Sequence, residues 1–324
     1  MSVRDLSLRV CLACAVAFAV PAVAQNYPVK PVLVISPVQA GSGGDTTLRL
    51  VTQVMSRNMG QQLLVENTVG AAGIIGAQRL ARAAPDGYTI GGISDSTVTY
   101  VPILQKRNDF DALNLFEPVS LLSVSTWVLV AHPSLPVRNA RELIALAKAQ
   151  ARPLDYASAG VGGSHHLVTE MFKAATGIAL NHVPYRGATQ AAVDVQAGHV
   201  PVMFSALSVA LGPIESGRLR ALGVASDART PLLKNTPTIA ESGVPGFSFS
   251  TWTGLFAPRN TPKPVIDRLA AEVAAALKDG ALRAKLQSTG GNPEASTPAE
   301  LAERIRQITA KMRKVIQDGG ITGE

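Results

Sequence analysis

The sequence predicts an α/β protein that consists of two αβ units joined by two crossing strands. Strand-like and helix-like segments alternate through most of the chain, which is typical of a largely parallel sheet covered by helices. Two long β-rich pieces, 116–130 and 247–257, interrupt the alternation and are long enough to run from one sheet into another. Each unit also carries a glycine-rich loop between a strand and a helix, at 41–44 and 160–163.

Residues 1–24 have the pattern of a cleavable secretory signal. Arg4 and Arg9 form a basic start, 10–20 is apolar, and Ala22-Val23-Ala24 is a small-x-small cleavage motif. The apolar run is shorter than the roughly 20 residues that a membrane span needs. We therefore expect cleavage after this motif and export to the periplasm.

The composition argues against several functional classes. Both cysteines, Cys11 and Cys14, lie in the predicted signal, so the exported chain would have no disulfide and no thiolate. The formal net charge is +7, but the lysines and arginines are scattered and aromatic residues make up only 5%. This pattern does not predict a nucleic-acid surface, whereas a mild positive charge favours small anionic ligands.

The first glycine loop carries the strongest local signal. A β-branched strand at 32–35 leads into the loop at 41–44, and Asp45 is the expected N-cap of the helix that follows. Such a loop lets backbone N–H groups approach a ligand, and the helix N-terminus adds partial positive charge. The loop matches neither the phosphate-loop nor the dinucleotide glycine motif. It therefore predicts a site for a small anion, with an ordinary βα turn as the alternative.

The remaining elements follow in order. In the first unit we expect strands at 63–66 and 88–93 and a helix at 74–82; in the second, strands at 154–158, 180–183, 200–204 and 219–225 and helices at 139–150, 164–176, 189–197 and 209–216. Helices at 264–278, 281–289 and 298–317 end the chain. Because 247–257 would return the chain to the first unit, we predict a discontinuous domain of 25–124 with 250–324, and a second domain of 125–249.

The second glycine loop is followed by Ser164 and His165, which raise the alternative of a hydrolase. A G-x-S-x-G elbow is absent, and no buried acid can be assigned as the third member of a triad. The side chains of His165 and His166 would point apart on a helix. His166 and Glu170 could share one face, but two ligands are too few for a zinc site. We therefore expect neither catalysis nor a metal, and no cofactor.

The predicted exported chain contains several short motifs, which are, in order, Pro37…Gly41…Gly43…Asp45, Ala84-Pro85-Asp86-Gly87-Tyr88, His182-Val183-Pro184-Tyr185-Arg186-Gly187 and Pro237-Thr238-Ile239-Ala240-Glu241. Together they resemble the periplasmic solute receptors of tripartite tricarboxylate transporters, the Bug family. The resemblance implies a type II-like periplasmic-binding fold of two domains that closes around a small organic acid. It also implies that the two glycine loops grip one ligand carboxylate, and that a membrane permease of the tripartite tricarboxylate type takes up the ligand or that its presence is signalled.

This reading makes the chain a non-catalytic receptor, expected as a monomer. A partner-binding envelope protein without a small ligand is the remaining alternative. The sequence names neither the solute nor the cognate permease.

The predicted ligand-binding residues come from both loops and from two strand ends. They are Val38, Ala40, Gly41, Ser42, Gly43, Asp45, Ser158, Gly160, Gly162, Gly163, Ser164, His165, Tyr185 and Ser205. Val38, Ala40, Ser42 and Gly163 depart from the usual family pattern. Ser205 stands where the family usually has Asp, so it would either remove a charge repulsion against a second ligand carboxylate or simply cap the next helix.

Overall fold

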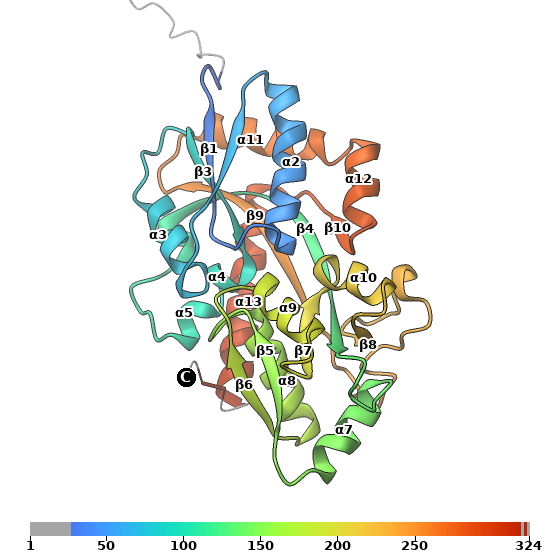
Figure 1. The fold of residues 1–324 in the computed structure, drawn as a ribbon. Coiled ribbons are helices and arrows are strands. Elements are labelled where there is room, and N and C mark those ends of the chain that lie inside the picture. The colour runs from blue at the N-terminus through green and yellow to red at the C-terminus, as the bar shows by residue number, and fades with distance from the viewer. Residues whose placement is uncertain (1–26, 319–320, 323–324) are drawn as a thin grey trace, which may run out of the picture.

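The computed structural model describes residues 27–318 and 321–322, and the predicted signal peptide lies outside the described residues. Figure 1 shows two αβ lobes, with strands β4 (Phe116–Ala131) and β9 (Ser250–Pro258) running between them. The two crossing strands of the predicted fold class are thereby confirmed. Within the described ranges, no helix combines the length and apolarity needed to cross a membrane.

The first lobe is built on a mixed sheet. Strand β1 (Val32–Ser36) pairs in parallel with β2 (Leu63–Asn67) and β3 (Thr89–Ser94). Strand β9 joins antiparallel to β3 and to β4, and β10 (Gly291–Pro293) pairs with β4. The helices of this lobe are α2 (Gly43–Met59), the 3-10 turn η1 (Ala71–Gly73), α3 (Ile74–Ala81), α4 (Asp95–Val98), α5 (Val101–Leu104), α6 (Ala112–Leu115), α11 (Lys263–Ala276), α12 (Gly280–Gln287) and α13 (Pro298–Asp318).

Helix α2 forms because its apolar residues share one face. Leu48, Val51 and Met55 recur at helical spacing, and their side chains are fully buried. They belong to a core that also contains residues of β1 and α11. The helix ends at Gly60, whose φ of 67° is the left-handed conformation that glycine adopts at low cost. The buried face fixes the helix on the sheet, with its N-terminus at the end of β1.

The second lobe repeats the same design. Strand β5 (Leu154–Ser158) is parallel to β6 (Leu180–Pro184) and to β7 (Val202–Ala206). Strands β7 and β8 (Arg220–Val224) pair antiparallel with the second part of β4. The helices of this lobe are α7 (Ala140–Ala149), α8 (Ser164–Thr176), α9 (Ala188–Gln196) and α10 (Leu207–Glu215).

Strand β4 is one continuous strand and not two separate β pieces. Its residues up to Thr126 pair with β9, whereas Trp127 and the residues after it pair with β7 or β8. Helix α13 packs against β4, with Leu301 and Ile305 in a core that spans both lobes. The two lobes therefore share a strand at their junction, although the exact limits of the predicted domains stay a prediction.

Candidate functional site

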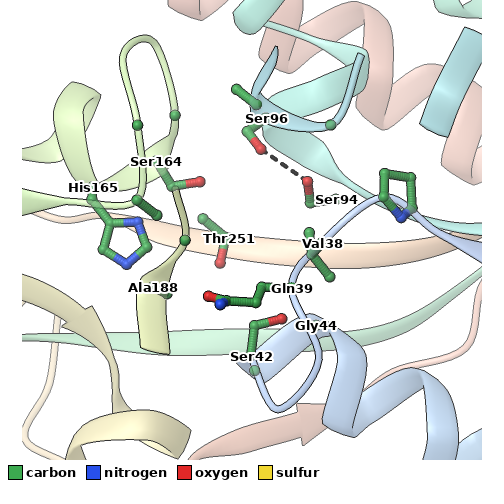
Figure 2. Close-up of a pocket in the computed structure, with 18 of the residues that line it drawn as sticks. Val38, Gln39, Ser42, Gly44, Ser94, Ser96, Ser164, His165, Ala188 and Thr251 are labelled. Carbon is green, nitrogen blue, oxygen red and sulfur yellow. Dashed lines mark hydrogen bonds between the residues drawn. The ribbon is translucent and has the colours of Figure 1, made fainter. Parts of the chain in front are cut away.

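A cavity of about 520 Å³ lies between the lobes, a size typical of small-molecule sites. The first lobe contributes the loop after β1, the turn at η1 and the start of α4; the second lobe contributes the loops before α8 and α9 and the start of α10. The crossing strands form one wall with Trp127, Thr251 and Trp252. Figure 2 shows Gln39 and Ser42 on one side of this cavity and Ser164 and His165 on the other.

The first loop is held by Asp45, whose side chain is only 2% exposed. Its carboxylate accepts hydrogen bonds from Gly41 N at 3.0 Å, Arg49 Nε at 3.0 Å, Asn67 Nδ2 at 2.7 Å and Ser36 Oγ at 3.4 Å. Burial alone would raise the pKa of the Asp45 carboxyl, but the hydrogen bonds from Arg49, Gly41 and Asn67 outweigh it and lower the pKa. Asp45 is therefore ionised and ties the loop to β1, β2 and α2.

Ser42, and not Asp45, is the N-cap of α2. The Ser42 side chain accepts a hydrogen bond from Asp45 N, and the helix begins at Gly43. The prediction of Asp45 as the cap was wrong because the carboxylate reaches back into the loop instead of bonding to the helix start. The N–H groups of Gly43 and Gly44 have no partner within the helix, and both residues line the cavity.

The second loop is held by neutral side chains. Ser158 Oγ accepts a hydrogen bond from Gly160 N at 3.1 Å and also bonds to His182 Nε2. Gly162 N donates to His166 Nδ1 at 3.0 Å. The rings of His166 and His182 stack with centroids 4.3 Å apart, and burial lowers the pKa of both, for His182 to about 4. The loop therefore rests on uncharged imidazoles.

Four helices of eight or more residues have their N-terminal ends on the cavity wall. They are α2 with Gly43, α8 with Ser164, α9 with Ala188 and α10 with Ala206 as its N-cap. The last three have no side-chain cap. Their first N–H groups and partial positive charge therefore face a shared space.

The charge of the wall points to the same kind of ligand. Among the described residues that line the cavity, Arg186 is the one with a permanent charge, and no Asp or Glu is present. His165 also lines the cavity, and burial lowers its pKa to about 4, so its ring is neutral near pH 7. A cavity with convergent donors, one cation and no carboxylate suits an anion.

Eight of the predicted ligand-binding residues line the cavity: Val38, Ser42, Gly43, Gly160, Gly163, Ser164, His165 and Tyr185. Tyr185 donates its hydroxyl proton to Asp194 at 2.7 Å, so this proton is not available to a ligand. That any of these residues contacts a ligand stays a prediction.

Five further predicted residues do not line the cavity. Ala40 and Gly41 are exposed on the outside of the first loop. The polar groups of the other three, Asp45, Ser158 and Gly162, form hydrogen bonds that hold the loops in place. The sequence identified the two loops correctly but could not separate residues that face the cavity from residues that hold the loop.

Both predicted roles of Ser205, ligand contact and helix cap, are wrong. It lies in β7 opposite Val128 of β4, is 1% exposed, and donates its hydroxyl proton to Ala206 O at 3.2 Å. The N-cap of α10 is Ala206, which makes no side-chain cap hydrogen bond. Ser205 thus neither faces the cavity nor caps the helix, because the neighbouring residue, Ala206, takes the cavity side.

Sequence reasoning missed the part of the wall that comes from short turns and crossing strands. The missed residues with polar side chains are Gln39, Ser94, Ser96, Gln105, Ser125, Trp127, Arg186, Thr251, Trp252 and Thr253. Ser94 and Ser96 flank the start of α4, a helix of four residues that periodicity cannot detect. Gln39 and Arg186 had a signal, because Gln39 lies between Val38 and Ala40 in the first loop and Arg186 follows Tyr185 in a motif already singled out.

Neither a metal centre nor a catalytic constellation emerges from the part of the chain that the structure describes. No group of three His, Cys, Asp or Glu residues there could hold a metal ion. Ser164 Oγ accepts a hydrogen bond from Tyr100 and not from a histidine, and His165 Nε2 has no hydrogen-bond partner. The pair Ser164 and His165 therefore lacks the nucleophile–base contact that a hydrolase requires.

Comparisons with known proteins agree with this geometry. A family model described as the tripartite tricarboxylate transporter family receptor matches residues 47–321. Protein BugT of Bordetella pertussis is 32% identical over 303 residues, which cover 93% of each chain. An R. palustris protein solved with adipate shares 30% identity with a TM-score of 0.88, over 91% of this chain and 99% of that one. MatC from Rhodopseudomonas palustris, with bound malate, shares 30% identity with a TM-score of 0.85, over 90% and 100%.

Fold and cavity together define a periplasmic solute-binding protein. More narrowly, the chain belongs to the tripartite tricarboxylate transporter receptors, the family that the sequence motifs resemble. The family and the solved structures to which the chain is similar are receptors and not enzymes.

The role of Asp45 can be tested by an isosteric change. Asp45→Asn keeps the shape but replaces one acceptor oxygen by a donor group that faces Gly41 N–H and Arg49. We expect a loss of about 2 kcal/mol in the free energy of unfolding, measured by urea denaturation. Asp267→Asn is the matched control, because it breaks only an exposed pair with Lys263 and should change stability by less than about 0.5 kcal/mol. Equal effects of the two variants would contradict the anchoring role.

Buried His165 predicts a pH dependence of stability. Its pKa is about 4 in the folded protein and 6.5 in an unfolded chain, so its contribution is complete above pH 6.5 and is lost as the pH falls toward 4. Over that range wild type should lose roughly 1.4 kcal/mol per pH unit more than His165→Gln. Denaturation at several pH values between 7.5 and 5 measures the free energy of unfolding of both proteins. The other histidines are the same in both, so their contributions cancel in the difference. Parallel pH profiles would show that His165 is not held neutral.

Proposed function

We propose that this receptor binds a small organic dicarboxylate in the cavity between its lobes. The observation that carries the proposal is the convergence of four helix N-termini on a wall without any carboxylate side chain. One ligand carboxylate is expected between α2 and α8, where the N–H groups of Gly43 and Ser164 start their helices. This arrangement meets an anion with donors from both sides.

The second carboxylate is assigned to the end of the cavity near α9. Arg186 and Ala188 line that end, and the first N–H groups of α9 are uncapped. Two relatives that share the fold over at least 90% of this chain were solved with adipate and with malate, both dicarboxylates. Those ligands support a dianionic solute here. A diamine, protonated at neutral pH, offers the donors no acceptor, and a diamide offers only neutral carbonyl oxygens, which form weaker hydrogen bonds than carboxylates.

The receptor is proposed to work in the periplasm as a monomer, after cleavage of the signal at Ala22-Val23-Ala24. It would deliver its ligand to a permease of the tripartite tricarboxylate type, which the family match supports in general. Loops from both lobes grip the ligand, so the ligand favours the closed arrangement of the lobes and shifts the population toward it.

Calorimetric titration with succinate, malate, glutarate and adipate tests the ligand class. At least one should bind with a Kd near 1 μM or tighter, on the order of −8 kcal/mol, and the diamide of that acid should not bind measurably. Arg186→Gln should weaken the dicarboxylate about tenfold but leave the corresponding monocarboxylate nearly unchanged. Arg218→Gln, whose arginine is exposed and is absent from the cavity wall, is the control. Binding of the diamide as tightly as the acid would contradict the proposal.

A further inference from the structure

Tyr100 reaches across the cleft although it does not line the cavity. It lies between α4 and α5 in the first lobe and is 1% exposed. Its hydroxyl group donates a hydrogen bond to Ser164 Oγ, at the start of α8 in the second lobe, over 2.8 Å. The proposed function does not involve Tyr100.

The direction of this hydrogen bond determines what Ser164 can do. A tyrosine hydroxyl has one proton, and burial raises the pKa of Tyr100 well above its usual value, so the phenol keeps that proton. Because Ser164 Oγ accepts it, the proton of Ser164 is free for another acceptor. Ser164 lines the cavity, and no protein acceptor for its hydroxyl is present among the described residues.

Other hydroxyl groups of the first lobe lie at the cavity wall. Ser94 Oγ and Ser96 Oγ are 2.9 Å apart, as the dashed line in Figure 2 shows. Ser94 Oγ is also 3.1 Å from Thr97 Oγ1, and Thr97 donates to Ala72 O at 3.1 Å. Among the described residues, none of these three hydroxyl groups bonds to Ser164, so the hydrogen bond from Tyr100 determines the direction of the Ser164 hydroxyl.

We propose that Tyr100 is a positioning residue that fixes the Ser164 hydroxyl as a donor to a ligand carboxylate. This inference rests on the proposed function and deepens it. Ser164 then requires an acceptor on the ligand at this end of the cavity. An ionised carboxylate satisfies it, and an ammonium group, which has only protons to offer, does not.

The contact also joins the two lobes beside the cavity. Tyr100 belongs to the segment between β3 and β4, whereas Ser164 belongs to the second lobe. A ligand that accepts the Ser164 proton polarises the bond from Tyr100 and strengthens it. The contact between the lobes is therefore stronger around a carboxylate than around an equally sized neutral group.

Tyr100→Phe tests the proposal, because it removes one oxygen and keeps the buried ring. The probe is whichever of succinate, malate, glutarate and adipate wild type binds most tightly. Calorimetry should show its Kd raised about tenfold in Tyr100→Phe and in Ser164→Ala. The double variant should be within about twofold of Ser164→Ala, since both changes remove the same donor. Tyr27→Phe is the matched control, because it removes a hydroxyl that bonds to Gly87 O, and neither residue lines the cavity.

The outcomes separate the two proposals. If none of the four acids binds wild type, the proposed function fails and this inference fails with it. If wild type binds and Tyr100→Phe stays within about twofold of it, the positioning role alone is wrong. Losses of about tenfold in each single variant that multiply to about a hundredfold in the double variant would show that Tyr100 acts independently of Ser164. Circular dichroism and melting of each variant without ligand exclude unfolding as the cause.

Discussion

The buried carboxylate of Asp45 is the interaction on which the rest of the site depends. It is ionised although it is almost fully buried, so the hydrogen bonds from Gly41, Arg49 and Asn67 are needed to offset the free-energy cost of burying the charge. These donors come from the loop, from α2 and from β2. Satisfying one charge therefore fixes the path of the loop and leaves the N–H groups of Gly43 and Gly44 free at the cavity.

The second loop reaches a similar result without a charge. Ser158, His166 and His182 accept or share the loop's hydrogen bonds, and both imidazoles stay neutral because their burial lowers their pKa. The two loops together present backbone donors and hydroxyl groups but no carboxylate to the cavity. Selectivity for an anion thus comes from oriented dipoles, with Arg186 as the single permanent charge on the wall.

The sequence predicted the fold class, the crossing strands and both glycine loops, because these depend on periodicity and on glycine spacing. It could not predict which polar residues face the ligand, since Asp45 and Ser158 look like contacts until their partners are known. For Ser205, a family difference suggested a role in specificity, but the alternation of side chains along β7 directs it into the core. The helices between β3 and β4 have four residues each and are too short for a periodic signal. The sequence therefore could not place Tyr100 and Ser96 near the cavity.

The central claim is that preorganised helix N-termini, and not side-chain charges, hold the ligand carboxylate. A crystal structure of the protein with its bound dicarboxylate tests it most directly. The account predicts one carboxylate between α2 and α8, within hydrogen-bond distance, about 3 Å, of the N–H groups of Gly43 or Gly44 and of the Ser164 hydroxyl, directly or through one water. A ligand whose carboxylates both contact Arg186, with these N–H groups facing only solvent, would contradict it.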